Sequence, residues 1–213
     1  RPFKPIFHLN QQAIKLENNN DKWIVTTSKG EIINAKCIVI AAGSGSFVPR
    51  KPPLQNIEKY ENKSIFYSVN NKKLFKNKKI LIVGGGDSAL DWVNELSFIS
   101  NVTLVHRRKE FRATTDSVNK MLELEKKRKI KFLLGQLNSL NGKDGKLESV
   151  TIIHENNKFN IKTDYLLPFY GLRMELGPIS KWNLKLKDGL IVVDTEKFET
   201  SVKGIFSIGD INT

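Results

Sequence analysis

The middle of the chain alternates between near-continuous apolar runs and apolar positions at helical spacing. The run at residues 78–83 (KKILIV) is typical of a buried parallel strand, because such a strand is covered on both faces. Apolar residues then recur at helical spacing over residues 89–96, and a second strand-like run covers residues 102–105. Residues 116–129 predict another helix, followed by a strand at residues 130–134. We therefore expect an α/β domain with a parallel sheet.

On either side of this region the pattern favours strands. β-Branched residues punctuated by glycine and turn residues are typical of strands and hairpins. The predicted strands are residues 23–27, 37–40, 150–154, 159–165, 190–193 and 204–208. Residues 51–77 are polar, with Pro52-Pro53 near their start, and predict a loop that crosses between two domains.

Composition places the chain among globular proteins and excludes several classes of function. Its 213 residues are 39% hydrophobic and 27% charged, a usual globular balance that allows one large domain or two small ones. The longest apolar runs fall far short of the ~18–20 residues of a membrane helix, so we expect no membrane association. A single cysteine, Cys37, excludes an intrachain disulfide, and the three scattered histidines predict no metal site.

The charge of the chain bears on its partners. There are 35 Lys and Arg against 22 Asp and Glu, a net charge of +13 that is spread over nearly every segment. An acidic protein partner and a general compositional bias both explain this surplus. Nucleic acid is not expected, because no Gly/Arg-rich or aromatic-interleaved stretch is present. The chain starts at Arg1 without a signal segment, so we expect a cytoplasmic protein seen as a fragment.

The strongest local motif is Gly84-x-Gly86-x-x-Ala89, between a predicted strand and a predicted helix. In a dinucleotide-binding fingerprint the first glycine permits a tight turn and the second lets a pyrophosphate reach the backbone, while the small third residue packs helix on strand. Backbone N–H groups at the start of the helix then bind phosphate. A glycine turn without a ligand is the alternative, and the flanking strand and helix favour the nucleotide.

A basic cluster follows the next predicted strand, about twenty residues on, where an NAD-binding domain has an acidic residue on the ribose hydroxyls. Here the chain has His106, Arg107 and Arg108, with Arg112 further along. Guanidinium groups match phosphate geometry, so the arginines favour a ribose that carries a 2′-phosphate, and hence NADP(H). The alternative is a surface cluster in a lysine-rich protein, and His106 alone favours neither a structural role nor a ligand role.

A third motif, Ser207-Ile208-Gly209-Asp210, lies at the end of the last predicted strand. An aspartate in this position can accept a hydroxyl hydrogen bond from the polyol chain of a cofactor, or it can cap a helix. By itself the motif favours the cap.

Taken together, these motifs resemble the thioredoxin reductase branch of two-domain flavoproteins. They are IVIAAG at residues 38–43, GGGDSA at 84–89, HRRKEFRA at 106–113 and SIGD at 207–210. Within that branch the chain looks most like the thioredoxin-reductase-like ferredoxin NADP reductases, on FVPR at residues 47–50, LDW at 90–92, FYGL at 169–172 and LGPI at 176–179. A thioredoxin reductase would carry Cys-x-x-Cys just ahead of the glycine motif, and residues 62–79 contain no cysteine.

The resemblance implies a Rossmann-like NADP(H)-binding domain inserted into a partial, Rossmann-like FAD-binding domain. Residues 1–50 and 169–213 would form the FAD-binding part, residues 51–71 a linker and residues 72–168 the NADPH-binding domain. The residues that match the NADPH site of the family are Gly84, Gly86, Asp87, Ser88 and Ala89 at the pyrophosphate, Arg107, Arg108 and Arg112 at the 2′-phosphate, and His106 beside them. Those that match the FAD site are Ala13 on the adenine side, Phe47 against the flavin and Asp210 on the ribityl or phosphate side.

The resemblance also implies a reaction. Hydride would pass from NADPH to FAD, and the reduced flavin would release electrons singly to ferredoxin or flavodoxin, in an enzyme expected to be a homodimer. The protein would supply binding, orientation and shielding from water, so no catalytic residue is predicted. The alternatives are another flavoprotein reductase of this branch, acting on a low-molecular-weight disulfide or as a divergent thioredoxin reductase, and a non-catalytic NADP-binding module.

The chain departs from the family pattern at its start. Members of the family open with a Gly-x-Gly-x-x-Gly fingerprint for FAD, whereas residues 1–20 contain no glycine. They also continue beyond the Gly-Asp motif with a helix and a tail. We therefore expect that this chain alone does not bind FAD tightly, and that NADP(H) binding is still open to it.

Overall fold

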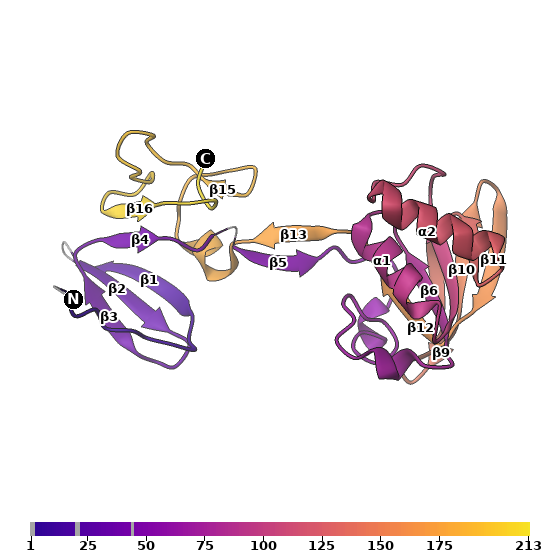
Figure 1. Ribbon diagram of the computed structural model, residues 1–213. Coiled ribbons are helices and arrows are strands. Elements are labelled where there is room, and N and C mark those ends of the chain that lie inside the picture. Colours follow the sequence, from indigo (N-terminus) through magenta and orange to yellow (C-terminus); the bar gives the residue numbers. More distant parts are fainter. Residues whose placement is uncertain (1–2, 20–21, 44) are drawn as a thin grey trace. The chain divides into compact units, whose positions relative to one another are not determined.

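The computed structural model describes residues 3–19, 22–43 and 45–213 (Figure 1). The chain divides into two compact units. Unit 2 is the continuous stretch of residues 49–172, and unit 1 is formed by residues 1–48 and 173–213 on either side of it. The chain enters unit 2 along β5 (Ser46–Pro49) and leaves it along β13 (Leu172–Glu175), and these two strands pair with each other.

Unit 2 is built on a four-stranded parallel sheet. Its strands are β6 (Lys79–Val83), β7 (Asn101–His106), β8 (Ile130–Leu134) and β12 (Tyr165–Pro168), in the order β12-β6-β7-β8. Helix α1 (Asp87–Leu96) connects β6 to β7, and α2 (Thr115–Lys126) connects β7 to β8. In chain order this is the 3-2-1-4 arrangement of a Rossmann-like half. The predicted α/β fold class with a parallel sheet is confirmed.

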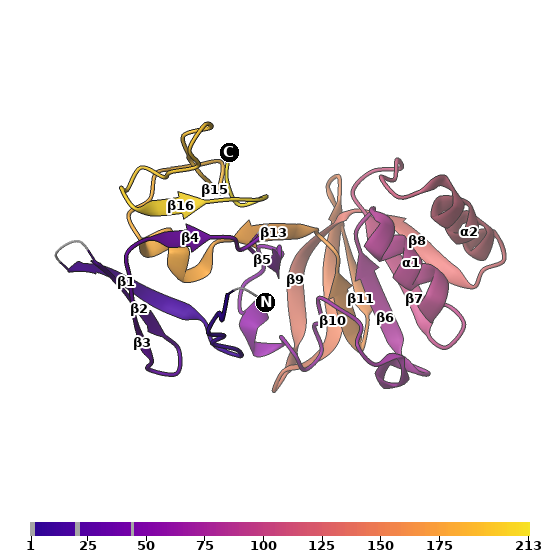
Figure 2. The same cartoon turned by 60° about the vertical axis from the view of Figure 1, so that its left-hand side comes forward.

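Both faces of the parallel sheet are covered, which explains the unbroken apolar run in β6. Ile80 and Ile82 face α1 and α2, whereas Leu81 and Val83 face the other way. There they pack on an antiparallel sheet of β9 (Gln136–Lys143), β10 (Lys146–His154) and β11 (Asn157–Lys162), in the order β11-β10-β9. Figures 1 and 2 show the helices and this second sheet on opposite sides of the parallel one.

The segment before β6 differs from the linker expected at residues 51–71. The structure places it in the core between the two sheets of unit 2, where Leu54, Ile57 and Ile65 are buried. The side chain of Tyr60 donates a hydrogen bond to the carbonyl of Gly142, at 3.0 Å. Single apolar residues spaced among prolines and polar groups form no periodic pattern, so the packing of this segment could not be predicted from a local pattern. It contains the short 3₁₀ helix η1 (Ile57–Lys59), and η2 (Lys72–Phe75) follows it.

Unit 1 contains mainly short strands. Its elements are β1 (Ala13–Asn19), β2 (Lys22–Thr27), β3 (Ile32–Ala35), β4 (Ile38–Ile40), η3 (Gly177–Lys181), β14 (Leu186–Lys187), β15 (Leu190–Ile191) and β16 (Ile205–Ser207). The first three strands form an antiparallel sheet, β14 pairs with β15, and β16 pairs in parallel with β4. Trp23, Ile40, Ile191 and Ile205 form its core. None of the helices in the described residues of either unit is both long and apolar enough to cross a membrane.

Candidate functional site

The glycine loop, residues 84–86, follows the carboxyl end of β6. Gly84 donates its N–H to the carbonyl of Val105 at 3.1 Å, which ties the loop to the neighbouring strand β7. A Cβ atom on Gly84 would lie 2.6 Å from the carbonyl oxygen of Phe169, so the backbone passes through a space that a side chain would fill. A Cβ on Gly86 would meet nothing within 4 Å. The first glycine is therefore needed for packing, and the second leaves the backbone open to a ligand.

Helix α1 begins directly after the loop and offers a binding site for an anion. Asp87 and Ser88 are its first two residues, where backbone N–H groups have no intrahelical acceptor. Ala89 is fully buried and packs against Gly84. This is the close helix–strand contact that the small third residue of the fingerprint permits. The free N–H groups and the helix dipole both favour a phosphate at this end.

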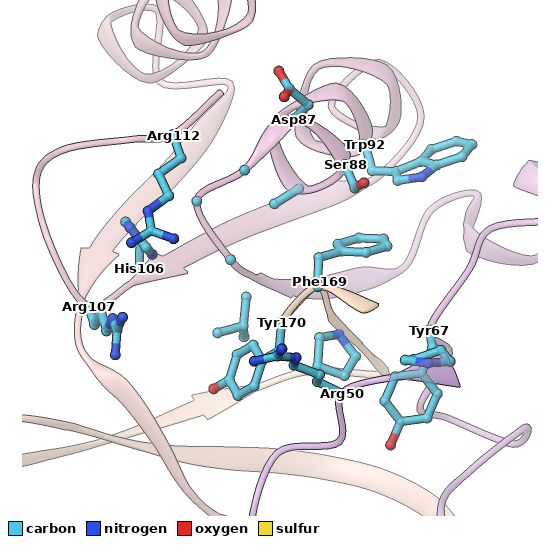
Figure 3. Close-up of a pocket in the computed structure, with 18 of the residues that line it drawn as sticks. Arg50, Tyr67, Asp87, Ser88, Trp92, His106, Arg107, Arg112, Phe169 and Tyr170 are labelled. Carbon is cyan, nitrogen blue, oxygen red and sulfur yellow. The ribbon is translucent and has the colours of Figure 1, made fainter. Parts of the chain in front are cut away.

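The predicted arginines lie beside the glycine loop. Arg107 and Arg108 directly follow β7. Both are exposed, as is Arg112. Arg112 donates its backbone N–H to the carbonyl of Gly85 at 2.7 Å. Figure 3 shows Arg107 and Arg112 on the same side of the pocket as His106. The structure thus brings the two predicted motifs together, although the bonded residues Gly85 and Arg112 are 27 residues apart in the sequence.

His106 packs between the two motifs. Its ring stacks on Phe111, with the ring centroids 5.3 Å apart and the planes at 26°. A Cβ atom on Gly85 would lie 2.3 Å from Nε2 of this ring, so only a glycine leaves room for it. Burial lowers the pKa of His106, and the positive charges of Arg107 and Arg108 lower it further, against an opposing hydrogen bond to the backbone of Glu110. The lowered pKa favours the neutral imidazole at neutral pH.

A cavity of about 1050 Å³ opens beside the glycine loop, with all of its lining residues in unit 2. Every residue predicted for NADPH lines it: Gly84, Gly86, Asp87, Ser88, Ala89, His106, Arg107, Arg108 and Arg112. Such a volume accommodates a large ligand, since pockets for small molecules run to ~300–1,000 Å³. Whether NADPH binds there stays a prediction.

Asp87 has a contact that the sequence did not predict. Its Oδ1 accepts the backbone N–H of Thr114 at 2.7 Å, so the carboxylate is already engaged by the chain. The expected role of Asp87 at a pyrophosphate can therefore rest only on its backbone N–H.

The cavity also has an aromatic wall, formed by Tyr67, Trp92, Phe169 and Tyr170. Burial raises the pKa of Tyr170, although the charge of Arg107 opposes the change, so the phenol stays protonated at neutral pH. In the sequence, Phe169 and Tyr170 were noted only as part of the motif FYGL that carries the family resemblance. Nothing local marks Tyr67, whereas Trp92, one helical turn after Ala89, could have been assigned to the same face of α1.

A charged network lies at the rim of the cavity. Glu61 accepts hydrogen bonds from Lys51 Nζ at 2.7 Å and from the Tyr67 hydroxyl at 2.6 Å. Burial would raise the pKa of Glu61, but these two hydrogen bonds outweigh it and the pKa is lowered. Lys51 is thus paired with a carboxylate, whereas in the described part of the chain Arg107, Arg108 and Arg112 form no ion pair.

The three residues predicted for FAD all lie in unit 1, on separate elements. Ala13 is half-buried at the start of β1, Phe47 is 60% exposed in β5, and Asp210 is exposed in a turn after β16. None of them lines the cavity of unit 2. In the described ranges, no group of three or more His, Cys, Asp or Glu side chains is arranged to hold a metal ion.

The strand order, the glycine loop and the open helix terminus define unit 2 as a Rossmann-like domain of the dinucleotide-binding type. Sequence comparison assigns nearly the whole chain, and not unit 2 alone, to a family. The profile of the family described as pyridine nucleotide-disulphide oxidoreductase matches residues 4–213, and the chain belongs to this family.

Named relatives agree with the resemblance to ferredoxin NADP reductases. Proteins named ferredoxin--NADP reductase from Parvibaculum lavamentivorans and Mesorhizobium japonicum are each 50% identical to the chain over 215 residues. Each match covers all of this chain and 63% of the relative, so the chain spans less than two thirds of the length of these proteins.

Solved structures share the fold. Thioredoxin reductase from Lactococcus lactis superimposes with a TM-score of 0.73 at 25% identity, over 95% of this chain and 66% of that one. A bacillithiol disulfide reductase from Staphylococcus aureus gives a TM-score of 0.77 at 15% identity, over 95% of this chain and 62% of the other, a likeness of fold alone.

Proposed function

We propose that the chain is part of an NADPH-dependent flavoprotein reductase and that unit 2 is its NADP(H)-binding domain. The observation that carries this proposal is the meeting of Arg107, Arg108 and Arg112 with the glycine loop in one cavity. An anion site at a helix N-terminus suits a pyrophosphate, and a cluster of guanidinium groups beside it suits the additional 2′-phosphate of NADP(H).

In this proposal the residues of unit 2 bind and orient the nucleotide. The N–H groups of Gly86, Asp87 and Ser88 would hold the pyrophosphate, and the arginines would hold the 2′-phosphate. The aromatic wall would exclude water from one side of the ligand. NADPH and FAD together would supply hydride transfer followed by the release of single electrons.

The acceptor in the proposal is ferredoxin or flavodoxin, and the complete enzyme is a cytoplasmic homodimer that carries FAD. The names of the relatives at 50% identity support ferredoxin as the acceptor. The family resemblance supports flavodoxin, FAD, the homodimer and the cytoplasmic location. The net charge of +13 would steer an acidic electron carrier toward the enzyme. Reduction of the carrier should then slow as salt is added, and a rate that does not depend on salt would argue against this steering.

Two of the structural neighbours are named thioredoxin reductase and bacillithiol disulfide reductase, so a disulfide is the alternative acceptor. An acceptor assay on the full-length protein distinguishes the two classes. Rapid reduction of ferredoxin or flavodoxin by NADPH supports the proposal, whereas rapid reduction of a low-molecular-weight disulfide or thioredoxin overturns the choice of acceptor.

Nucleotide binding is tested by calorimetric titration of the chain with NADP⁺ and, separately, with NAD⁺ at low salt. We expect NADP⁺ to bind at least about tenfold more tightly, a difference of ~1.4 kcal/mol. Arg107→Ala and Arg108→Ala should abolish this preference. Lys131→Ala is the matched control, because Lys131 is an exposed cation of unit 2 that does not line the cavity. Equal affinity for the two nucleotides, or an equal effect of the control, would contradict the assignment.

A further inference from the structure

We propose that Asp87 is a positioning residue that gives unit 2 its preference for NADP(H) over NAD(H). Its carboxylate would act by holding the arginine segment, residues 107–114, against the glycine loop. This inference rests on the proposed function, since it concerns the same nucleotide site.

Two hydrogen bonds tie the end of the arginine segment to the glycine loop. Oδ1 of Asp87 accepts the N–H of Thr114, and the carbonyl of Gly85 accepts the N–H of Arg112, both at 2.7 Å. The start of the segment is fixed by β7, whose last residue, His106, accepts the N–H of Gly135 at 3.0 Å. The arginine segment is thus held at both ends, and the side chain of Asp87 contributes one of the two hydrogen bonds at its far end.

The backbone is what locates the three guanidinium groups. Arg107, Arg108 and Arg112 are exposed, and in the described part of the chain none of them forms an ion pair with a carboxylate. A long side chain without a fixed partner keeps its rotamer freedom, which is lost when it binds a phosphate. A fixed backbone limits the positions that these side chains must search, and such preorganisation increases affinity.

The chemistry of Asp87 fits an anchor better than a phosphate ligand. The residue is the first of α1, the place where the fingerprint presents the pyrophosphate. A carboxylate repels phosphate there, so a direct ligand role would be unfavourable. A carboxylate is, however, a strong acceptor for a backbone N–H, and its charge is favourable at a helix N-terminus. The hydrogen bond to Thr114 explains the presence of an acid at this position.

The test compares three variants on the same helix, each titrated with NADP⁺ and NAD⁺. Asp87→Ala removes the acceptor, and Asp87→Asn keeps an acceptor oxygen without the charge. Asp91→Ala is the matched control, because Asp91 lies one turn further along α1 and accepts the hydroxyl of Ser117 at 2.7 Å, outside the arginine segment. We expect Asp87→Ala to weaken NADP⁺ binding about tenfold and NAD⁺ binding about twofold or less. Asp87→Asn and Asp91→Ala should retain the preference for NADP⁺.

A fourth variant removes the donor of the same hydrogen bond. Thr114→Pro deletes the N–H, and the φ of −58° at this residue suits proline. It should reproduce the loss of preference seen for Asp87→Ala, with both proteins checked for folding by thermal melting. Hydrogen exchange at the Thr114 amide should be slow in the wild type and fast in Asp87→Ala, with no nucleotide present.

The outcomes separate this inference from the proposed function. If the wild type does not prefer NADP⁺, the proposed function itself fails. If the wild type prefers NADP⁺ but Asp87→Ala and Thr114→Pro retain that preference, the anchoring role of Asp87 is refuted. An equal loss of NADP⁺ and NAD⁺ affinity also refutes it, because it would place Asp87 at a part that both nucleotides share.

Discussion

One added methyl group at Gly85 should destabilise unit 2 through the ring of His106. In Gly85→Ala the new Cβ would lie 2.3 Å from Nε2, 2.4 Å from Cε1 and 2.7 Å from Cδ2. Ordinary contacts between such atoms are ~3.5–4.0 Å, so the ring must move by about 1 Å and lose its stacking on Phe111. Overpacking costs ~1–3 kcal/mol and the lost stacking adds about 0.5–1.5 kcal/mol. The reduced freedom of the unfolded chain offsets about 0.4–1 kcal/mol, which leaves a net loss of about 2 kcal/mol.

Urea unfolding followed by the helical circular dichroism signal measures this loss, because α1 and α2 both lie in unit 2. The control is the same substitution in a His106→Ala background, where the clash is absent. In that background Gly85→Ala should lower the free energy of unfolding by less than about 0.5 kcal/mol. The coupling energy between positions 85 and 106 should therefore account for most of the loss of about 2 kcal/mol. A cost that is the same with and without the histidine ring would refute the packing argument.

Three further predictions have separate expected outcomes. Gly86→Ala should leave the stability within about 0.5 kcal/mol, since its Cβ meets no atom, but should weaken NADP⁺ binding in calorimetry because the methyl group occupies the space for the pyrophosphate. Burial lowers the pKa of His106 in the folded state below its ordinary 6.5, so the unfolded state binds the proton more readily. Its contribution to stability is therefore complete above about pH 6.5 and lost as the pH falls below that value; His106→Gln should remove this part of the pH dependence of unfolding. Met121→Ala should cost ~2–5 kcal/mol because the side chain is fully buried, whereas Phe98→Ala, at a residue 80% exposed, should change stability by less than about 0.5 kcal/mol in the same urea assay.

Local patterns were sufficient to predict the parallel sheet of unit 2. The strand expected at residues 130–134 is β8 (Ile130–Leu134), and the helix expected over residues 89–96 is α1, which begins two residues earlier at Asp87. These elements are buried on one or both faces, so their hydrophobic period is strong. β1 (Ala13–Asn19) was not predicted, because no residue in it is fully buried and its sequence shows little alternation.

Part of the candidate site could likewise be predicted from local sequence, and part could not. The glycine loop and the arginines could be predicted because turn chemistry and phosphate recognition require particular residues at nearby positions. The hydrogen bond from Thr114 to Asp87 joins residues 27 apart, and the aromatic wall brings together Tyr67 and Tyr170 from opposite ends of unit 2. Contacts of this kind depend on how elements pack, which no local pattern encodes.

The pairing of β5 with β13 has a consequence for how the chain folds during synthesis. The two ends of unit 2 meet, since Arg50 donates its N–H to the carbonyl of Gly171 at 2.9 Å. In unit 1, by contrast, β4 can pair only after β16 has been synthesised, because Ile38 pairs with Ile205. Domains usually form in the order of synthesis, but here the middle of the chain is complete before the part that precedes it. Once unit 2 has folded, the long loop between β4 and β16 is reduced to a short one, which lowers the entropy lost on closing it. The central segment thus prepares the assembly of the unit encoded on both sides of it.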